Sequence, residues 1–305
     1  MDIVFDLLGL LACLILLGNA QLYAASVLIH HTGHGHGAKP RWFGKLLAEL
    51  AGILTLRQPL EVYRATHGLH HSESRFARAG LDPDASFVQK QGFQLGDSVW
   101  LSYWKLLRLV LNVKLQYKLI KKRLTLTFAW QDGRLRNVAA GIIWTVILWT
   151  VIHLAVFLPF VILLILAMVV GNFSAIAELL SRHKWFVEID DETNRQWVLS
   201  HARFYGALPP VEGASVGAWL LWFSKILQAV IERSLVGAGD LGWHIAHHVR
   251  WDLDEYHGQP AWCNPVYAYY PYLDQLGSEK IYWSTAEAID AWFLAMEEQD
   301  ISDDK

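Results

Sequence analysis

The chain has 305 residues, of which 53% are hydrophobic and 18% carry a charge, compared with a usual charged share of about 25%. Its net charge of −3 provides no positive field for a nucleic-acid partner. The two cysteines, Cys13 and Cys263, form no C-x-x-C motif, which excludes a typical zinc ribbon or iron–sulfur module and argues against a disulfide framework. The composition favours an integral membrane protein.

The first apolar stretch covers residues 3–29 and is interrupted by Asp6 and Asn19. It is long enough to cross a bilayer, which takes about 20 helical residues. The acidic start MDIVFDLL lacks the positive region of a signal peptide, so we predict an uncleaved span. Basic residues appear only after this stretch, which predicts that the N-terminus lies outside and the following segment in the cytoplasm.

The next segments are shorter or more polar. Residues 42–58 predict an amphipathic helix on the membrane surface, with a short buried helix as the alternative. Pro59 separates this helix from a second one that continues into residues 67–71. Residues 79–97 are predicted as a loop because of their Gly and Asp-Pro content. Residues 99–126 form a basic amphipathic stretch whose charged face is expected to meet solvent or anionic headgroups.

Residues 137–181 contain no Lys or Arg, and Glu178 is their only carboxylate. As a single helix they would extend about 67 Å, more than twice the hydrocarbon thickness, so the stretch must fold back. We place the corner at Leu158-Pro159 and predict spans at 138–157 and 159–180, with both outer ends in the cytoplasm. His153, within the first of these spans, is predicted to bond to a neighbouring helix rather than to bind a metal.

Residues 215–236 predict another interfacial helix, and no clear strand is found. The acidic tail, 297–305, is predicted to be frayed and without function. We therefore expect residues 1–296 to form a single all-α membrane domain. It would have about three transmembrane helices, interfacial amphipathic helices and a cytoplasmic histidine-rich cap.

The spacing H-x-x-H-H occurs twice among the 14 histidines. The two triplets are His67, His70 and His71, and His244, His247 and His248. On a helix, positions i, i+3 and i+4 share one face, so each triplet directs three imidazoles to one place. Residues 30–36 add a third group, consisting of His30, His31, His34 and His36. Neutral imidazole is a good ligand for iron, copper, zinc or nickel, so we predict a metal site. His201 is predicted to be an ordinary surface residue.

These boxes resemble those of the membrane-bound fatty acid desaturase and hydroxylase superfamily, which includes alkane hydroxylases and carotenoid ketolases. The resemblance extends from His30 to about Pro271. Residues 30–35, HHTGHG, are similar to the family's H-D-A-G-H-G box and imply His30 and His34 as ligands, although pairing of His31 with His36 stays open. Residues 178–183 resemble an S-E-H stretch of the bacterial branch, with Arg182 in place of Glu, and imply His183 as a ligand.

Some positions depart from the desaturase pattern. Ala246 stands where desaturases often have Glu, and residues 249–251 replace the usual L-F-P. Leu179 stands where some desaturases carry a ligating Asn, which favours a site of nine histidines, as in alkane hydroxylases. The implied metal ligands are His30, His34, His67, His70, His71, His183, His244, His247 and His248. Expected partners of these imidazoles in the second coordination shell are Asp84, Glu178, Asp240 and Asp252.

The resemblance implies a non-haem diiron enzyme that uses O2 to desaturate or hydroxylate an aliphatic chain, with a fatty acyl lipid as the first expectation. No catalytic residue is expected beyond the metal centre. Electrons are expected from a separate ferredoxin, rubredoxin or cytochrome b5-type protein, because the sequence carries no signature of such a module. The expected location is the bacterial inner membrane with the metal site on the cytoplasmic side. An alkane hydroxylase or a carotenoid ketolase is the alternative within the class, and a zinc transporter or sensor is the alternative outside it.

Overall fold

The computed structural model describes residues 2–35, 37–129, 131–189, 195–203, 206–236, 245, 248, 255–256, 259–260 and 281–303. The chain divides into two compact units. Unit 1 comprises Met1–Ala65 and Asn112–Ala175, and unit 2 comprises Thr66–Leu111 and Ile176–Lys305. The expected histidine ligands fall in both units, so each unit is described in turn.

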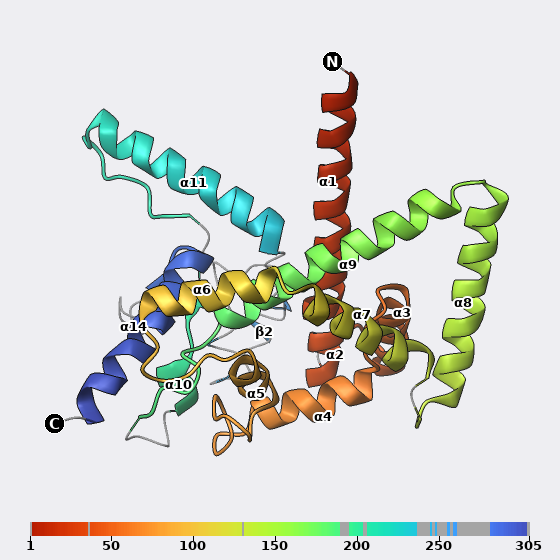
Figure 1. The fold of residues 1–305 in the computed structure, drawn as a ribbon, viewed down its shortest axis with the longest axis horizontal. Helices are drawn as coiled ribbons and strands as arrows, with labels where there is room; N and C mark the ends of the chain where they lie inside the picture. Colours follow the sequence, from red (N-terminus) through yellow and green to blue (C-terminus); the bar gives the residue numbers. More distant parts are fainter. Residues whose placement is uncertain are drawn as a thin grey trace. The chain divides into compact units, whose positions relative to one another are not determined.

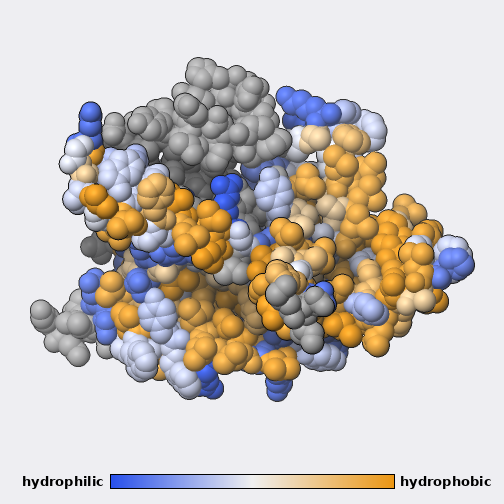
Figure 2. Space-filling view, turned by 90° about the horizontal axis from the view of Figure 1, so that it is seen from above, coloured by the Kyte–Doolittle hydropathy of each residue, from blue (hydrophilic) through white to orange (hydrophobic). Residues whose placement is uncertain are grey.

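Three helices are long and apolar enough to cross a membrane, which confirms the prediction of an all-α membrane protein with about three spans (Figure 1). They are α1 (Asp2–Tyr23), α8 (Arg134–His153) and α9 (Phe157–Leu180). Few of their side chains are buried in the protein. Hydrophobic residues cover large parts of the face seen in Figure 2, as expected for surfaces that meet lipid.

The turn between α8 and α9 differs from the predicted corner at Leu158-Pro159. α8 ends at His153, and the turn occupies residues 154–156, where Ala155 has a φ of 56°. Pro159 instead lies in the first turn of α9, where its missing N–H removes no helical hydrogen bond. His153 is exposed and stacks on Trp149 of its own helix, with ring centroids 5.4 Å apart. The prediction that it bonds to a neighbouring helix is therefore wrong.

The first span continues directly into the first histidine box. α1 is followed by a π-helical segment, η1 (Ala24–Ile29), and then by α2 (His30–His34). α2 ends at Gly35, whose φ of 89° is the left-handed conformation that glycine adopts readily. α3 (Arg41–Leu54) packs against η1 and α8 through small buried residues and leaves Trp42 exposed, so it is amphipathic as predicted. α4 (Leu60–His70) carries the second box.

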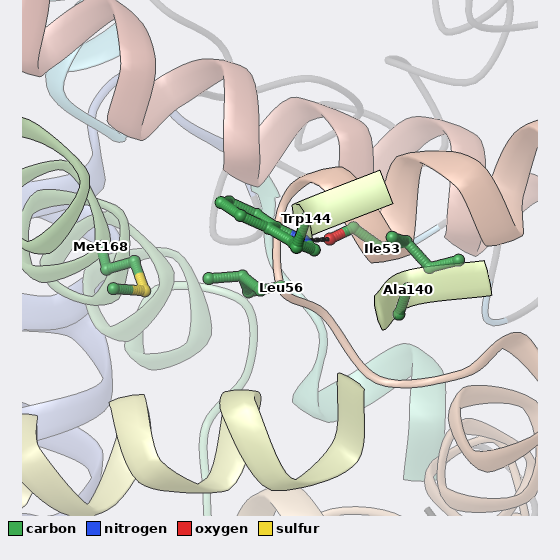
Figure 3. Packing of buried hydrophobic residues seen from close by; sticks show 5 residues of the cluster. All are labelled: Ile53, Leu56, Ala140, Trp144 and Met168. Atoms are coloured by element: carbon green, nitrogen blue, oxygen red, sulfur yellow. Dashed lines mark hydrogen bonds between the residues drawn. The ribbon is translucent and has the colours of Figure 1, made fainter. Parts of the chain in front are cut away.

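Unit 1 is held together by two kinds of contact. Its apolar core joins α3 to α8 and α9, and the indole Nε1 of Trp144 donates to the backbone oxygen of Ile53 at 2.9 Å (Figure 3). α1 and α9 approach closely where Gly18 meets Gly171, because a Cβ built at Gly171 would lie 3.2 Å from the backbone oxygen of Gly18. Small residues at such crossings let helix backbones come together within a membrane.

The predicted basic stretch 99–126 is divided between two helices, α6 (Val99–Val110) and α7 (Val113–Phe128). Asn112 causes the break because its side chain caps α7 by accepting from the N–H of Leu115 at 2.9 Å. The lysines of α7 are exposed, as expected for a solvated or headgroup-facing side. Arg123 is not, because only 8% of it is exposed. The prediction of a charged face turned outward is therefore wrong for this residue.

Unit 2 contains the short helix α5 (Pro83–Lys90) where a loop was predicted. The Asp-Pro pair initiates this helix, since Asp82 is the N-cap and Pro83 occupies its first position. The remaining described elements are α10 (Arg195–Leu199), α11 (Val216–Val236), α14 (Thr285–Asp303) and two pairs of two-residue strands. β1 (Ala202–Arg203) runs parallel to β4 (Ile281–Tyr282), and β2 (Glu255–Tyr256) runs antiparallel to β3 (Gln259–Pro260).

The core of unit 2 is aromatic. Phe93, Trp292 and Phe293 are fully buried and pack on one another where α14 meets α6. The indole N–H of Trp292 donates to the backbone oxygen of Trp185 at 3.0 Å. This contact ties α14 to the segment that follows α9, where one of the expected ligands lies. α14 continues to Asp303 and thus includes most of the predicted tail.

Candidate metal centre

The second histidine box brings three imidazoles together at the end of α4. His71 follows the last residue of the helix, but its N–H still bonds to the backbone oxygen of His67 at 3.0 Å, so the helical geometry continues. The ring centroids of His67 and His71 are 4.4 Å apart. Their Nε2 atoms lie 2.9 Å apart, close to the separation of about 3 Å expected for neighbouring ligands that each stand about 2.1 Å from one metal ion.

Two histidines from distant parts of the chain join this box within unit 2. His183 follows the end of α9, and its ring centroid is 5.0 Å from that of His70. The ring centroid of His248 is 4.8 Å from those of His70 and His183. The ligand atoms of these three residues all lie within 4.8 Å of one another, and all three side chains are buried. His248 also stacks on His71 at 4.2 Å. Five of the expected ligands therefore converge in unit 2.

The Nδ1 atoms of His70, His183 and His248 are each held by an oxygen. The partners are Asp82 Oδ2 at 2.8 Å, Ser200 Oγ at 3.1 Å and Gln196 Oε1 at 3.0 Å, respectively. Where the oxygen accepts, Nδ1 carries the ring hydrogen, and Nε2 is the nitrogen presented to a metal. Histidines that bind a metal usually donate the N–H of their second ring nitrogen to a carboxylate, a carbonyl or a water in this way.

Asp82 is the strongest of these partners. Its Oδ2 accepts from the ring of His70 and from the N–H of Ala77, each at 2.8 Å, while its Oδ1 accepts from the N–H of Asp84. Burial alone would raise the pKa of Asp82, but the hydrogen bond and charge of His70, together with the two backbone N–H groups, hold this pKa below its usual value. The residue that starts α5 is thus also the carboxylate that orients His70.

Gln196 links two of the histidines. Its Nε2 donates to the backbone oxygen of His71 at 2.7 Å, and its Oε1 contacts His248. Its own N–H donates to Glu73 Oε1 at 3.1 Å, which fixes α10 against the turn after the box. The neighbouring Arg195 is buried and donates to the backbone oxygen of Phe76 at 2.9 Å. α10 therefore positions His248 relative to the second box.

Apolar side chains surround the cluster. Phe76 and Trp185 are fully buried, and their rings lie 4.7 Å and 4.9 Å from that of His183. Burial, followed by the nearby charges of His70, Arg182, His201 and Arg203, holds the pKa of His183 well below its ordinary value. A lowered pKa keeps the imidazole neutral, which is the form that binds a metal. The residues present therefore suit a metal held by neutral nitrogen ligands.

The sequence pointed to different partners for these imidazoles. Asp84 lies in a group with His70 and Asp82 whose ligand atoms are within 4.8 Å of one another, but the bond to His70 comes from Asp82. Glu178 forms an ion pair with Arg182 four residues further on. In the sequence, Asp82 was part of the D-P-D of residues 82–84, within the segment predicted as a loop, and was not predicted to contact a histidine. Gln196 and Ser200 belong to no histidine motif, so the sequence offered no signal for them.

In unit 1, His30 is buried, and its ring centroid lies 5.0 Å from that of His34 and 6.1 Å from that of Tyr63. His31 is half-buried and stacks on His30 at 5.5 Å. The first-box pair favoured by the sequence, His30 and His34, thus lies on one side of α2. The expected ligands His36, His244 and His247 lie outside the described residues, as do Asp240 and Asp252, the expected partners of ligating imidazoles.

His201 differs from its prediction as a surface residue. Only 1% of it is exposed, its ring packs on Tyr282 at 4.5 Å, and its Nδ1 lies 3.3 Å from the backbone oxygen of Ser181. A lone histidine carries no sequence signal of burial. His201 directly precedes β1, and Tyr282 of the paired strand β4 packs on its ring.

A model of the family described as fatty acid desaturase matches residues 6–274. The match covers most of the chain, and the chain therefore belongs to the fatty acid desaturase family. All histidines of the described clusters fall within the matched residues. No curated protein and no solved structure matches the chain. Membership of this family supports a metal-dependent oxidoreductase that acts on lipids, in agreement with the buried histidine cluster and the three candidate spans.

Proposed function

We propose that this protein is an O2-dependent diiron oxidoreductase of the membrane that desaturates or hydroxylates the aliphatic chain of a fatty acyl or related lipid. The observation that supports it most is the cluster of His70, His183 and His248, with each Nδ1 held by an oxygen. These three imidazoles come from separate segments of a desaturase-family chain. Their arrangement fits metal binding far better than it fits a protein core that holds no metal.

The proposed ligand set combines two sources of support. His67, His70, His71, His183 and His248 are supported by their convergence in unit 2. His30, His34, His244 and His247 are supported by their motifs alone. Two iron ions bound by these residues would supply the O2 activation that attack on an unactivated C–H bond requires.

The surrounding residues have roles of their own in this proposal. Asp82 and Gln196 keep Nδ1 of their histidines protonated and fix the ring planes, so the imidazoles need not reorganise when a metal binds. Phe76 and Trp185 exclude water from this side of the cluster, which protects reactive species from side reactions. These neighbouring residues therefore orient the ligating imidazoles and keep water away from them.

The membrane location and the family guide the proposals for the substrate and the electron donor. The candidate spans and the family place the protein at a membrane, where an apolar chain is available. α11 exposes Leu220, Leu221 and Phe223, which supports the proposed position of this helix in the membrane interface. We propose a separate donor of the ferredoxin, rubredoxin or cytochrome b5 type. The proposed orientation, with the metal site in the cytoplasm of a bacterial cell, rests on the distribution of Lys and Arg in the sequence.

The test combines metal analysis with product mass. The purified protein should contain two irons per chain, and zinc alone or a haem Soret band would contradict the proposal. Lipids from cells with and without the protein are then compared by mass spectrometry. Loss of two hydrogens identifies a desaturase, and gain of one oxygen a hydroxylase. An alkane or carotenoid product would move the assignment to those branches of the superfamily.

A matched pair of variants links the product to the cluster. His70→Ala should abolish the product and reduce bound iron. His153→Ala, whose ring stacks on Trp149 outside the cluster, should leave both unchanged. Equal product from both variants would show that the cluster does not perform the reaction.

A further inference from the structure

α7 buries a polar face. The buried side chains of this helix are Gln116, Arg123 and Thr127, while Val113 and Tyr117 are 80% and 64% exposed. Positions 116, 123 and 127 share one side of a helix. Lysines occupy the exposed side as well, so α7 carries polar side chains on both sides. The interior side must then offer partners to three polar groups.

The partners within unit 1 satisfy only some of these groups. Gln116 Oε1 accepts from Asn172 Nδ2 at 2.9 Å, and Arg123 Nη1 donates to Gln21 Oε1 at 3.1 Å. Gln116 Nε2 and Thr127 Oγ1 are buried and have no hydrogen-bond partner among the described residues. Buried polar groups without partners are rare in proteins, and each one suggests a ligand or a bound water.

Arg57 adds further donors. It follows α3, and its Nε and Nη2 are buried with no hydrogen-bond partner among the described residues. Burial lowers its pKa to about 10. The pKa of Arg123 is likewise held well below its usual value, by burial and then by the charge of Arg57. The backbone oxygens of Arg57 and Thr127 both accept from Arg136, so the segment after α3 lies against the part of α7 that carries Arg123.

The nearest ion pair does not compensate these charges. Glu49 is engaged by Arg136, whose Nε donates to Glu49 Oε2 at 2.6 Å. The other nitrogens of Arg136 donate to backbone oxygens, including that of Arg57 at 3.0 Å. Among the described residues no carboxylate pairs with Arg57 or Arg123. Two buried cations without a counter-charge are costly unless an anion binds.

The position of these residues relative to the ends of the candidate spans indicates which kind of molecule carries the anion. Arg136, which donates to the backbone oxygen of Arg57, lies in the first turn of α8, where this candidate span begins. Arg57 is therefore at the level where a span ends, which is where lipid headgroups lie in a bilayer. Arginine presents a planar fork of donors that matches the oxygens of a carboxylate or phosphate.

We propose that Arg57 and Arg123 bind the anionic headgroup of a lipid through its carboxylate or phosphate oxygens. The residues of the site all belong to unit 1, and none of them is a member of the histidine cluster. It goes beyond the proposed function and does not depend on it, because the site needs no metal and no turnover.

The experiment measures binding to the purified full-length chain in a neutral detergent. Thermal unfolding is followed with palmitate, phosphatidic acid, inorganic phosphate, acetate or uncharged diacylglycerol. Palmitate or phosphatidic acid should raise the melting temperature saturably, and diacylglycerol should not. Equal stabilisation by inorganic phosphate or acetate would overturn the lipid assignment in favour of a small free anion. No shift with any anion would overturn the site.

Variants connect binding to the two arginines. Arg57→Gln and Arg123→Gln should each weaken lipid binding at least tenfold, whereas Lys118→Gln, at an exposed position of the same helix, should bind as the wild type. Without ligand, Arg57→Gln should unfold no earlier than the wild type, because it removes a desolvated charge and keeps the backbone oxygen that Arg136 contacts. Undiminished lipid binding by both arginine variants would contradict the proposal.

Discussion

The orientation of each clustered imidazole depends on a different neighbour. His70 is held by a carboxylate, His248 by an amide and His183 by a hydroxyl. The sequence identified His70 and His248 because their spacing repeats, and His183 because its segment resembles an S-E-H stretch, but it could not identify their neighbours. Spacing along one helix fixes which residues share a face, whereas Gln196 reaches its two histidines from a separate segment. Partners that come from tertiary folding leave no periodic pattern in the sequence.

Replacing Asp82 with Asn should weaken metal binding. The change removes the negative charge of the carboxylate that accepts from His70. In the wild type this charge favours protonation of Nδ1, so without it the ring is no longer held in one tautomer. We expect iron affinity to fall about 10–100-fold, as is usual when such a partner is lost. Iron content after dialysis against a graded chelator measures this effect. Asp132→Asn, at an exposed position, is the control, and equal iron retention in both variants would contradict the role of Asp82.

Gln196→Ala should affect the metal site and the fold of unit 2 together. It removes the acceptor of His248 and the donor to the backbone oxygen of His71. A buried group that loses its partner costs about 1–3 kcal/mol, so we expect earlier thermal unfolding as well as less bound iron. Gln196→Glu keeps an acceptor for His248 but cannot donate to His71 when ionised. It should therefore retain more iron than Gln196→Ala, and the reverse order would refute this reading.

At the scale of elements, length and charge predicted the spans well. The stretch without Lys or Arg had to fold back because one helix would be too long, and the structure places the turn only a few residues from the predicted corner. Local chemistry was harder to predict. The Asp82-Pro83 pair reads equally as a turn or as a helix start, and the structure shows the start of α5. The buried face of α7 could not be predicted because lysines on its other face suggested a wholly solvated surface.

The crossing of α1 and α9 provides a test of helix packing. A Cβ at Gly18 would already lie 2.8 Å from Val170 Cγ1 and 3.1 Å from the backbone nitrogen of Gly171. Gly18→Leu should therefore separate the two helices, with a cost of about 1–3 kcal/mol from overpacking. Thermal unfolding in detergent measures it. Gly9→Leu, in the same helix with nothing within 4 Å of the added Cβ, should be neutral. Equal stability of the two variants would show that the crossing is not tight.

At the scale of the molecule, the chain combines a membrane unit with a unit that carries most of the described histidines. Family membership and three candidate spans establish the membrane setting. The direction of insertion follows only from the distribution of basic residues, which is a property of the sequence and the translocation machinery rather than of the fold. The orientation is therefore tested in intact cells.

Cysteine labelling in cells determines that direction. In a chain without its native cysteines, Ala155→Cys in the turn after α8 should react with an impermeant maleimide from outside the cell. Ser74→Cys, at an exposed position shortly after the second box, should react only after permeabilisation. The predicted topology places these positions on opposite sides of the membrane. The reverse labelling pattern would invert the orientation, and labelling of both from outside would contradict the topology.

The π-helical segment η1 sets the rotational phase between the first span and the histidines that follow it. A π-turn accommodates one residue more than an α-turn. If the segment relaxed to α-helix with all six residues in place, the extra residue would turn α2 by about 100° relative to α1. Deleting one residue from Ala24–Ile29 would remove that extra residue, so the relaxed helix would direct His30 and His34 roughly as before. In this protein the wide turn accommodates a residue that an α-helix of the same direction would not hold, so a deletion there should be tolerated better than an insertion.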